Sequence, residues 1–226
     1  MGTRATAIRK DLLTLAQKLP PGGLAFLSDV NWDEYESLLN AVDERPAVRL
    51  TYDNGRMQIM TLSISHERLG DLFPHIIMAL AIECGMNFIG IRSTTLKKQE
   101  DEKGAEADDC YYFNDYKLMG RKKKIDLSID PPPDLAFEVD ITSPSLSKFP
   151  IYASIGVPEL WRYTNGKAYF YRLDDGDYIE IDHSDLFPFF APDDLFSYLG
   201  IGEAEGAVEM INELKEWLKT ARGKKQ

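Results

Sequence analysis

The segment 134–141 constrains the fold of this chain more than any other. It alternates apolar residues with acidic or small ones, so as a strand it has two unlike faces. Its apolar side chains all lie on one face. The opposite face carries Asp134, Ala136, Glu138 and Asp140. Any fold that contains this strand needs a hydrophobic layer on one side and either water or a polar site on the other.

Two interpretations of the acidic face are open, and the segment alone supports them about equally. The first is the solvated face of a half-buried sheet. The second is a cation site, because Glu138 and Asp140 lie ~7 Å apart along the face and repel unless they meet water or share a cation. A solvated face normally mixes Thr, Lys and Arg, whereas this one carries only acids and Ala. The composition therefore favours the cation site.

Hydrophobic periodicity predicts a mixed α/β (α+β) fold, a mixed β-sheet flanked by helices. An Asp-Asn-Gly turn at 53–55 predicts a hairpin over 49–60. We expect Ser65 to cap a long helix that ends near Cys84 and contains Pro74. Further helices are expected at 6–19, 31–41, 145–155 and 204–220, the last with Val208, Ile211, Leu214 and Leu218 in line. Strands are expected at 87–91, 94–96, 108–113, 160–163, 167–173 and 178–181. The segments 97–104 and 185–199 are expected to be a charged loop and an irregular stretch.

The length of 226 residues is sufficient for one sizeable core. We expect a helical extension at 1–28, a main domain at 29–200, and an amphipathic helix with a basic tail at 201–226. No run approaches ~18 apolar residues, so no membrane span is expected, and charges interrupt the first 19 residues, which predicts a cytoplasmic protein. The net charge of −11 counts against a protein that coats nucleic acid non-specifically.

A second acidic group precedes the aromatic run 111–113. If that run forms a strand beside 134–141, Asp108 lies at its leading end and can approach Glu138. Taken alone, an acidic pair here is more often a turn feature. A third carboxylate, Glu67, is expected in the first turn of the long helix, where an acid also interacts favourably with the helix dipole. His66 beside it is more often a capping or surface residue than a site residue.

Four ordered blocks make the chain resemble a known family. They are Ser-x-Ser-His-Glu at 63–67 after the hairpin, Gly-x-Glu-x-Asp-Asp-Cys-Tyr-Tyr at 104–112, Pro-Pro-Asp-Leu-x-x-Glu-x-Asp at 132–140, and Gly-Val-Pro-Glu-x-Trp at 156–161. Together they are similar to the Uma-type restriction-endonuclease family over roughly residues 32–181. Each block alone would be weak, but the joint match is specific.

The resemblance implies a restriction-endonuclease-like core of the PD-(D/E)xK type, with a metal at one sheet edge. It implies that Asp108, Glu138 and Glu67 are the metal ligands. The superfamily motif places a lysine two residues after the second acid, where this chain has Asp140. Lys148, ten residues after Glu138, resembles the family's relocated lysine.

The resemblance suggests hydrolysis of DNA phosphodiester bonds. Mg²⁺, or Mn²⁺ in its place, would activate a water molecule while a lysine orients that water and offsets charge. The basic run 121–124 can contact the phosphate backbone, although it is more often a solvated loop. The resemblance is also compatible with a homodimer. The alternatives are an inactive nuclease-fold domain that binds nucleic acid or a protein, favoured by Asp140, and a hydrolase of smaller phosphate esters.

Overall fold

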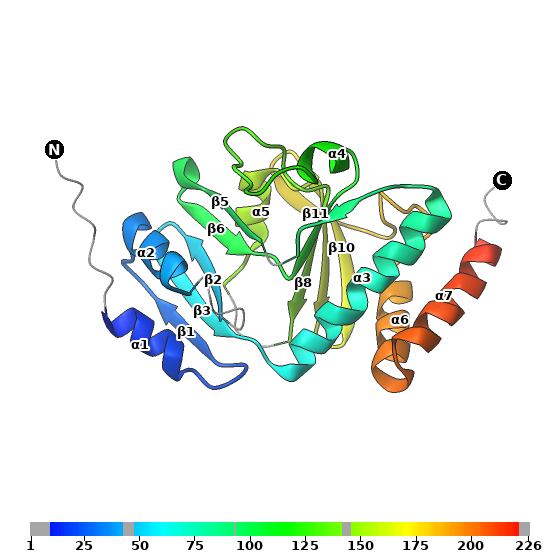
Figure 1. Ribbon diagram of the computed structural model, residues 1–226, viewed down its shortest axis with the longest axis horizontal. Coiled ribbons are helices and arrows are strands. Elements are labelled where there is room, and N and C mark those ends of the chain that lie inside the picture. The colour runs from blue at the N-terminus through cyan, green and yellow to red at the C-terminus, as the bar shows by residue number, and fades with distance from the viewer. Residues whose placement is uncertain (1–9, 43–47, 93, 142–145, 222–226) are drawn as a thin grey trace.

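The computed structural model describes residues 10–42, 48–92, 94–141 and 146–221, and in these ranges the strands form two sheets (Figure 1). The N-terminal sheet, called sheet A, has five antiparallel strands, with helices α1 (Lys10–Lys18) and α2 (Trp32–Val42) packed against it. Across sheet A the order is β1 (Leu24–Leu27), β3 (Arg56–Thr61), β2 (Val48–Asp53), β6 (Lys103–Glu106) and β5 (Thr95–Lys98).

The second sheet, called sheet B, has six strands and is mixed. Its order is β11 (Asp177–Ile181), β10 (Lys167–Asp174), β9 (Glu159–Thr164), β8 (Leu135–Asp140), β7 (Asp109–Tyr112) and β4 (Ile89–Gly90). β8 and β9 run parallel, and α5 (Phe149–Ile155) lies between them in the chain. The other neighbours in sheet B are antiparallel. The crossover through α5 brings the segment before this helix back beside β8.

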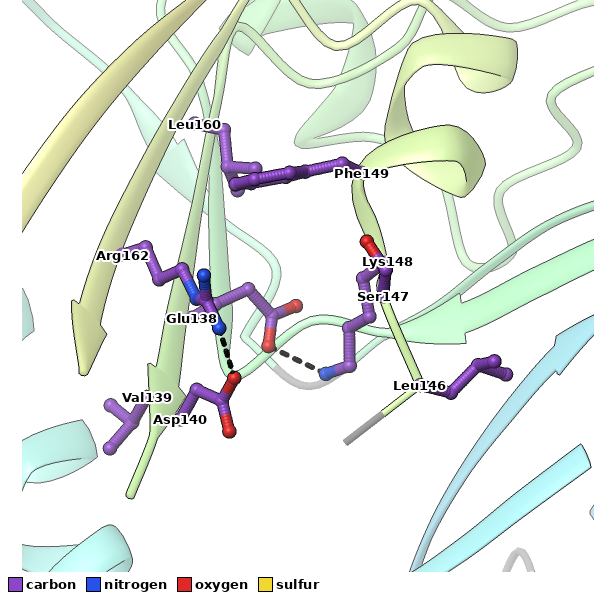
Figure 2. A pocket seen from close by; sticks show the side chains of 9 residues that line it. All are labelled: Glu138, Val139, Asp140, Leu146, Ser147, Lys148, Phe149, Leu160 and Arg162. Carbon is purple, nitrogen blue, oxygen red and sulfur yellow. Dashed lines mark hydrogen bonds and ion pairs between the residues drawn. The ribbon is translucent and has the colours of Figure 1, made fainter. Parts of the chain in front are cut away.

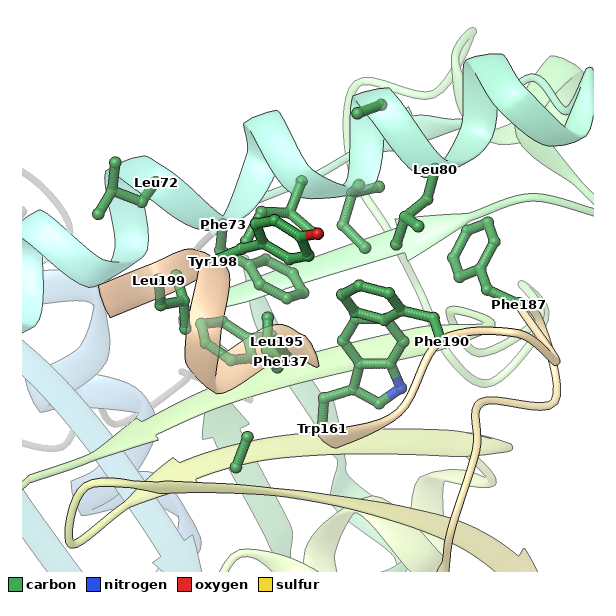
Figure 3. Close-up of a cluster of buried hydrophobic side chains, with 14 of the residues drawn as sticks. Leu72, Phe73, Leu80, Phe137, Trp161, Phe187, Phe190, Leu195, Tyr198 and Leu199 are labelled. Carbon is green, nitrogen blue, oxygen red and sulfur yellow. The ribbon is translucent and has the colours of Figure 1, made fainter. Parts of the chain in front are cut away.

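The main core lies between sheet B, the long helix α3 (Ile64–Cys84) and α6 (Pro192–Glu205) (Figure 3). Helix α7 (Ala207–Ala221) also packs against it. Phe73 of α3 stacks on Phe137 of β8 with ring centroids 3.7 Å apart, and Trp161 stacks on Phe170 at 4.0 Å. The apolar face predicted for segment 134–141 is therefore the face that packs on α3. Two short elements, η1 (Gln99–Asp101) and α4 (Tyr116–Met119), complete the described structure.

Several expectations are confirmed. The hairpin turns at Asn54 and Gly55, both with positive φ, as the Asn-Gly pair requires. Helix α3 runs through Pro74 without a break and ends at Cys84. Its cap, however, is Ser63 and not Ser65: the Ser63 hydroxyl accepts a hydrogen bond from the backbone N–H of His66 at 3.3 Å.

The expected mixed α/β fold with helices flanking a mixed sheet is confirmed, but the strands form a second sheet as well, and this sheet A contains a strand where a loop was predicted. Strand β6 begins at the end of the charged segment 97–104 and continues two residues beyond it. It is held by its neighbours β2 and β5 rather than by its own composition. Gly104 allows this, because a Cβ there would lie 2.4 Å from the Tyr35 hydroxyl. Such a contact is invisible in the local sequence.

The expectation of an irregular stretch at 185–199 is also wrong in its second half, where α6 begins. Pro192 occupies the first turn of α6, a position that suits proline, and the Asp194 carboxylate accepts a hydrogen bond from the N–H of Ala191 at 2.8 Å. α7 begins only after Gly206, and Val208 is exposed, whereas Leu214 and Leu218 are buried as expected.

The expected domain limits at 28 and 200 stay a prediction. β1, from the proposed extension, pairs with β3, and α6 crosses residue 200. In the part of the chain that the structure describes, no helix combines the length and apolar character that a membrane span needs.

Candidate active site

Asp108 is positioned by the pairing of β7 with β8. It stands directly before β7, where Asp109 lies opposite Phe137 in the antiparallel register. Its Oδ2 accepts a hydrogen bond from the backbone N–H of Val139 at 2.7 Å, and its side chain is only 3% exposed. The Asp108 carboxylate is thus tied to β8 at the residue next to Glu138.

His66 reaches the same carboxylate from the first turn of α3. Its Nε2 lies 3.2 Å from Asp108 Oδ1 as an ion-pair contact, and neither of these buried atoms has a hydrogen-bond partner among the described residues. Burial lowers the pKa of His66, but the Asp108 carboxylate more than offsets this and the pKa lies above its ordinary value. Burial raises the pKa of Asp108, but Lys148 and His66 outweigh it, so the net shift is downward.

Glu138 is held from the other side by two residues of the α5 segment. Lys148 Nζ lies 2.5 Å from Glu138 Oε2 and also donates to the backbone oxygen of Glu106 at 3.1 Å, and the Tyr152 hydroxyl donates to Glu138 Oε1. Lys148 and Tyr152 are four residues apart, which places them on one side of this helical turn. Burial raises the pKa of Glu138 to about 7, although Lys148 opposes the shift.

Asp140 lies at the rim of the same face and is paired with Arg162 of β9. In the parallel register Arg162 is the partner of Glu138, which places the guanidinium beside both acids. Together these side chains border a cavity of about 240 Å³ (Figure 2). Its lining is Glu138, Val139, Asp140, Leu146, Ser147, Lys148, Phe149, Leu160 and Arg162.

The structure brings together Asp108, Glu138 and Lys148 from three separate segments, with Asp140 beside them. It does not bring Glu67 into this cluster. Glu67 is exposed on α3, and among the described residues no hydrogen bond or ion pair joins it to the other candidates. The residue of α3 that faces the site is His66, its buried neighbour.

Sequence reasoning gave His66 and Tyr152 little weight and missed Arg162. A signal for His66 existed, because it stands three residues before Leu69 and seven before Phe73 in the buried stripe of α3. For Tyr152 the signal was its spacing from Lys148. For Arg162 there was none, because its position depends on the register of β9 against β8.

The donor set suits Mg²⁺ better than a metal that needs an all-protein cage. No group of three His, Cys, Asp or Glu side chains in the described ranges is placed to hold a metal. Mg²⁺ is usually bound by one or two carboxylates, with waters and substrate phosphate completing its shell. Asp108 and Glu138 supply two carboxylates, and Asp108 Oδ1 is a buried acceptor that lacks a hydrogen bond. The residues present therefore fit such an ion.

Comparison with protein families gives a clear result. The model of the Uma2 family, described as "Putative restriction endonuclease", matches residues 32–200, about three quarters of the chain. The chain belongs to the Uma2 family. The family resemblance noted in the sequence is thereby confirmed, and Uma2 membership places this protein in a nuclease family.

Among solved structures, one match is described as "a putative nuclease belonging to DUF820" from Anabaena variabilis. It is 14% identical, the match covers 66% of this chain and 90% of that one, and the TM-score is 0.49. That likeness is too distant to transfer residue roles. No curated protein matches the chain.

Proposed function

We propose that this Uma2 protein is a metal-dependent endonuclease that hydrolyses DNA phosphodiester bonds at the site formed by Asp108, Glu138 and Lys148. The observation that carries the proposal is the convergence of these three side chains. Two carboxylates and a lysine come from separate segments and converge, with Glu138 and Lys148 at the wall of the cavity and Asp108 behind them, and all three are buried except for a small part of Lys148. Burying so many charges is costly, so their convergence suits a chemical role.

Asp108 and Glu138 would hold Mg²⁺, with Mn²⁺ as a substitute. When bound, such an ion lowers the pKa of a coordinated water and offsets charge on the phosphate. In the metal-free protein Glu138 keeps its proton through part of the neutral range, since its pKa is about 7. Cation binding at this carboxylate therefore releases a proton and is favoured as the pH rises.

Lys148 has the position of the water-orienting cation. Its ammonium has three donors, and Glu138 and the Glu106 carbonyl each accept from it. An ammonium held there can hydrogen-bond the attacking water and stabilise negative charge that develops on the phosphate. Tyr152 fixes the other oxygen of Glu138, which keeps the carboxylate from rotating away. His66 holds Asp108 from the side of α3.

A second candidate function is that of an inactive nuclease-fold domain that binds nucleic acid or a protein. The observation that favours it is Asp140 at the position of the motif lysine, where it is paired with Arg162. The small cavity also keeps open a third, hydrolysis of smaller phosphate esters. Nicking of plasmid DNA excludes the second, and comparison of mononucleotides with duplex DNA as substrates separates the third.

A supercoiled-plasmid assay with Mg²⁺ or Mn²⁺ tests the proposal. Wild-type protein should nick the plasmid, and chelation with EDTA should abolish nicking. The variants Glu138→Ala, Glu138→Gln and Asp108→Asn, purified in the same way, should be inactive, while Glu67→Gln should keep activity because Glu67 is exposed away from the cluster. Equal cleavage by the wild type and Glu138→Ala would reveal a contaminating nuclease and end the proposal.

Two sites in one assembly can cut both strands of a duplex in a single binding event, so we further propose that the protein acts on DNA as a homodimer in the cytoplasm. Sedimentation velocity with and without a DNA duplex tests the assembly. A monomer in both conditions would contradict it.

A further inference from the structure

Arg162 lies at the wall of the cavity on the opposite side of Glu138 from Lys148 (Figure 2). Its place is fixed by β9, where it is the parallel-register partner of Glu138. Its Cζ lies 5.6 Å from the centroid of the Phe149 ring, and the Arg162 side chain is 31% exposed. The guanidinium is therefore packed in place and still within reach of a ligand in the cavity.

Asp140 orients this guanidinium through the ion pair from the neighbouring strand. Arginine has five N–H donors in a rigid plane and binds phosphate oxygens with two parallel hydrogen bonds. Asp140, which occupies the position of the motif lysine, thus does not supply a cation itself. It pairs with the cation of Arg162, which comes from β9.

The charge balance of the site shows when such a cation would attract an anion. Asp108, Glu138 and Asp140 contribute three negative charges when ionised, and Lys148 and Arg162 contribute two positive ones, which gives −1. A divalent cation on Asp108 and Glu138 changes the sum to +1. The metal-loaded site would therefore favour a phosphodiester that the empty site repels.

We propose that Arg162 binds the non-bridging oxygens of a DNA phosphate in this cavity and that Asp140 is its positioning residue. This inference rests on the proposed nuclease function and names a phosphate-binding residue of the same site. A purely structural ion pair makes a different prediction. If Arg162 serves only to neutralise Asp140, loss of either partner has the same effect on DNA binding, through stability alone.

The two interpretations are separated by the affinity for a short fluorescein-labelled DNA duplex, measured by anisotropy. Ca²⁺ replaces Mg²⁺ to limit turnover, and the KCl concentration is varied. Arg162→Met should bind about 10-fold more weakly, the loss expected for a charge-assisted hydrogen bond, and its salt slope should be smaller by about 0.9, the value for one phosphate contact. Asp140→Asn should weaken binding only about two- to threefold and keep the wild-type salt slope, because asparagine can still accept a hydrogen bond from the guanidinium and Arg162 keeps its charge.

Arg172→Met is the matched control. Arg172 lies in β10 of sheet B and also pairs with an acid, Asp185, but it does not line the cavity. Its loss should leave affinity and salt slope unchanged. Arg162→Lys keeps the charge and can keep the pair with Asp140, so it should fold even if Arg162→Met does not. It should lose part of the affinity, about threefold, because an ammonium cannot form the two-bond contact.

Equal weakening by Arg162→Met and Asp140→Asn, or wild-type affinity in Arg162→Met and Arg162→Lys, would overturn the inference. If the wild type nicks plasmid in Mg²⁺ while the Arg162 variants bind like it, only this inference fails. If the wild type neither binds nor nicks DNA, the proposed function fails and the inference falls with it.

Discussion

Two groups of charged side chains in this molecule behave very differently. In the candidate site, Asp108, Glu138 and Lys148 are largely buried and converge at one point. The groove beside β5, of about 760 Å³, is lined by four lysines and four acids, most of which are at least partly exposed. The lysines are Lys97, Lys98, Lys122 and Lys124, and the acids are Glu36, Glu100, Asp126 and Asp130.

The difference lies in burial rather than in the number of charges. The groove contains part of the basic run 121–124, the most conspicuous cationic feature of the sequence. However, Lys122 forms an ion pair with Asp130 at 2.6 Å, and the charges of the residues that line the groove sum to zero. The lysines of the groove are partly or fully exposed, so water screens them and their pairs contribute little, although Asp130 itself is buried. In the site, burial raises the pKa of Glu138 to about 7. We therefore expect the buried Lys148, rather than the basic run 121–124, to serve the proposed function.

Loss of the buried cation should have the largest effect. Lys148→Met leaves the Glu138 and Asp108 carboxylates without their common partner, so we expect a loss of about 3–5 kcal/mol in the free energy of unfolding. Plasmid nicking should also disappear. Urea denaturation monitored by tryptophan fluorescence measures the stability, with Lys219→Met, from an exposed pair on α7, as control. A loss below about 1 kcal/mol would show that the cluster is not energetically coupled.

The titration of Glu138 should have the next largest effect. Its folded pKa of about 7 lies above its ordinary value of 4.5, so the stabilising contribution is complete below pH about 4.5 and is lost as the pH rises through 7. Without metal, the unfolding free energy of wild type minus that of Glu138→Gln should fall by about 2–3 kcal/mol over this interval. Denaturation curves in EDTA at several pH values measure it. A flat or rising difference would contradict the buried-carboxylate account.

The neighbours His66 and Glu67 offer a sharper test of which side of α3 faces the site. His66→Gln removes the group beside Asp108 and should lower nicking activity about 10-fold. This corresponds to an increase of about one kcal/mol or more in the activation free energy, because Asp108 is less well positioned. Glu67→Gln should have less than a twofold effect. Plasmid nicking compared at matched protein concentration measures both. The reverse order would restore Glu67 as the helix-borne ligand.

The smallest effect is expected from the basic run. The triple variant Lys122→Ala, Lys123→Ala and Lys124→Ala should weaken binding of the fluorescent duplex by less than about threefold, because these exposed charges are screened or paired. Anisotropy measures it under the conditions used for Arg162. A loss larger than that of Arg162→Met would make the groove, and not the cavity, the principal DNA contact.

Much of the fold could be predicted because its signals are local. The Asn-Gly turn fixed the hairpin, the stripe on α3 gave its buried face, and alternation in β8 separated the core from the acids. The acidic face proved buried rather than solvated, since Ala136 and Glu138 are covered. Features that depend on distant partners could not be predicted. Strand β6 requires the gap that Gly104 leaves for Tyr35, and Arg162 enters the site only through strand register.

Glu67 illustrates a different limit, because the block that carries it was correctly located but the side chain was not. Successive residues on a helix point about 100° apart, so the direction of a single side chain depends on the phase of the helix. The phase set by Leu69 and Phe73 turns His66 inward and Glu67 outward. Family resemblance located the segment, and packing decided which of its residues faces the site.

Direct measurement of metal binding tests the central claim that Asp108 and Glu138 form one cation site. Titration of the full chain with Mn²⁺, followed by electron paramagnetic resonance of the free ion, gives stoichiometry and affinity without any substrate. The account predicts one site in the wild type and in Glu67→Gln, and at least about a 10-fold loss of affinity in both Asp108→Asn and Glu138→Gln. Wild-type Mn²⁺ affinity in those two variants would contradict it.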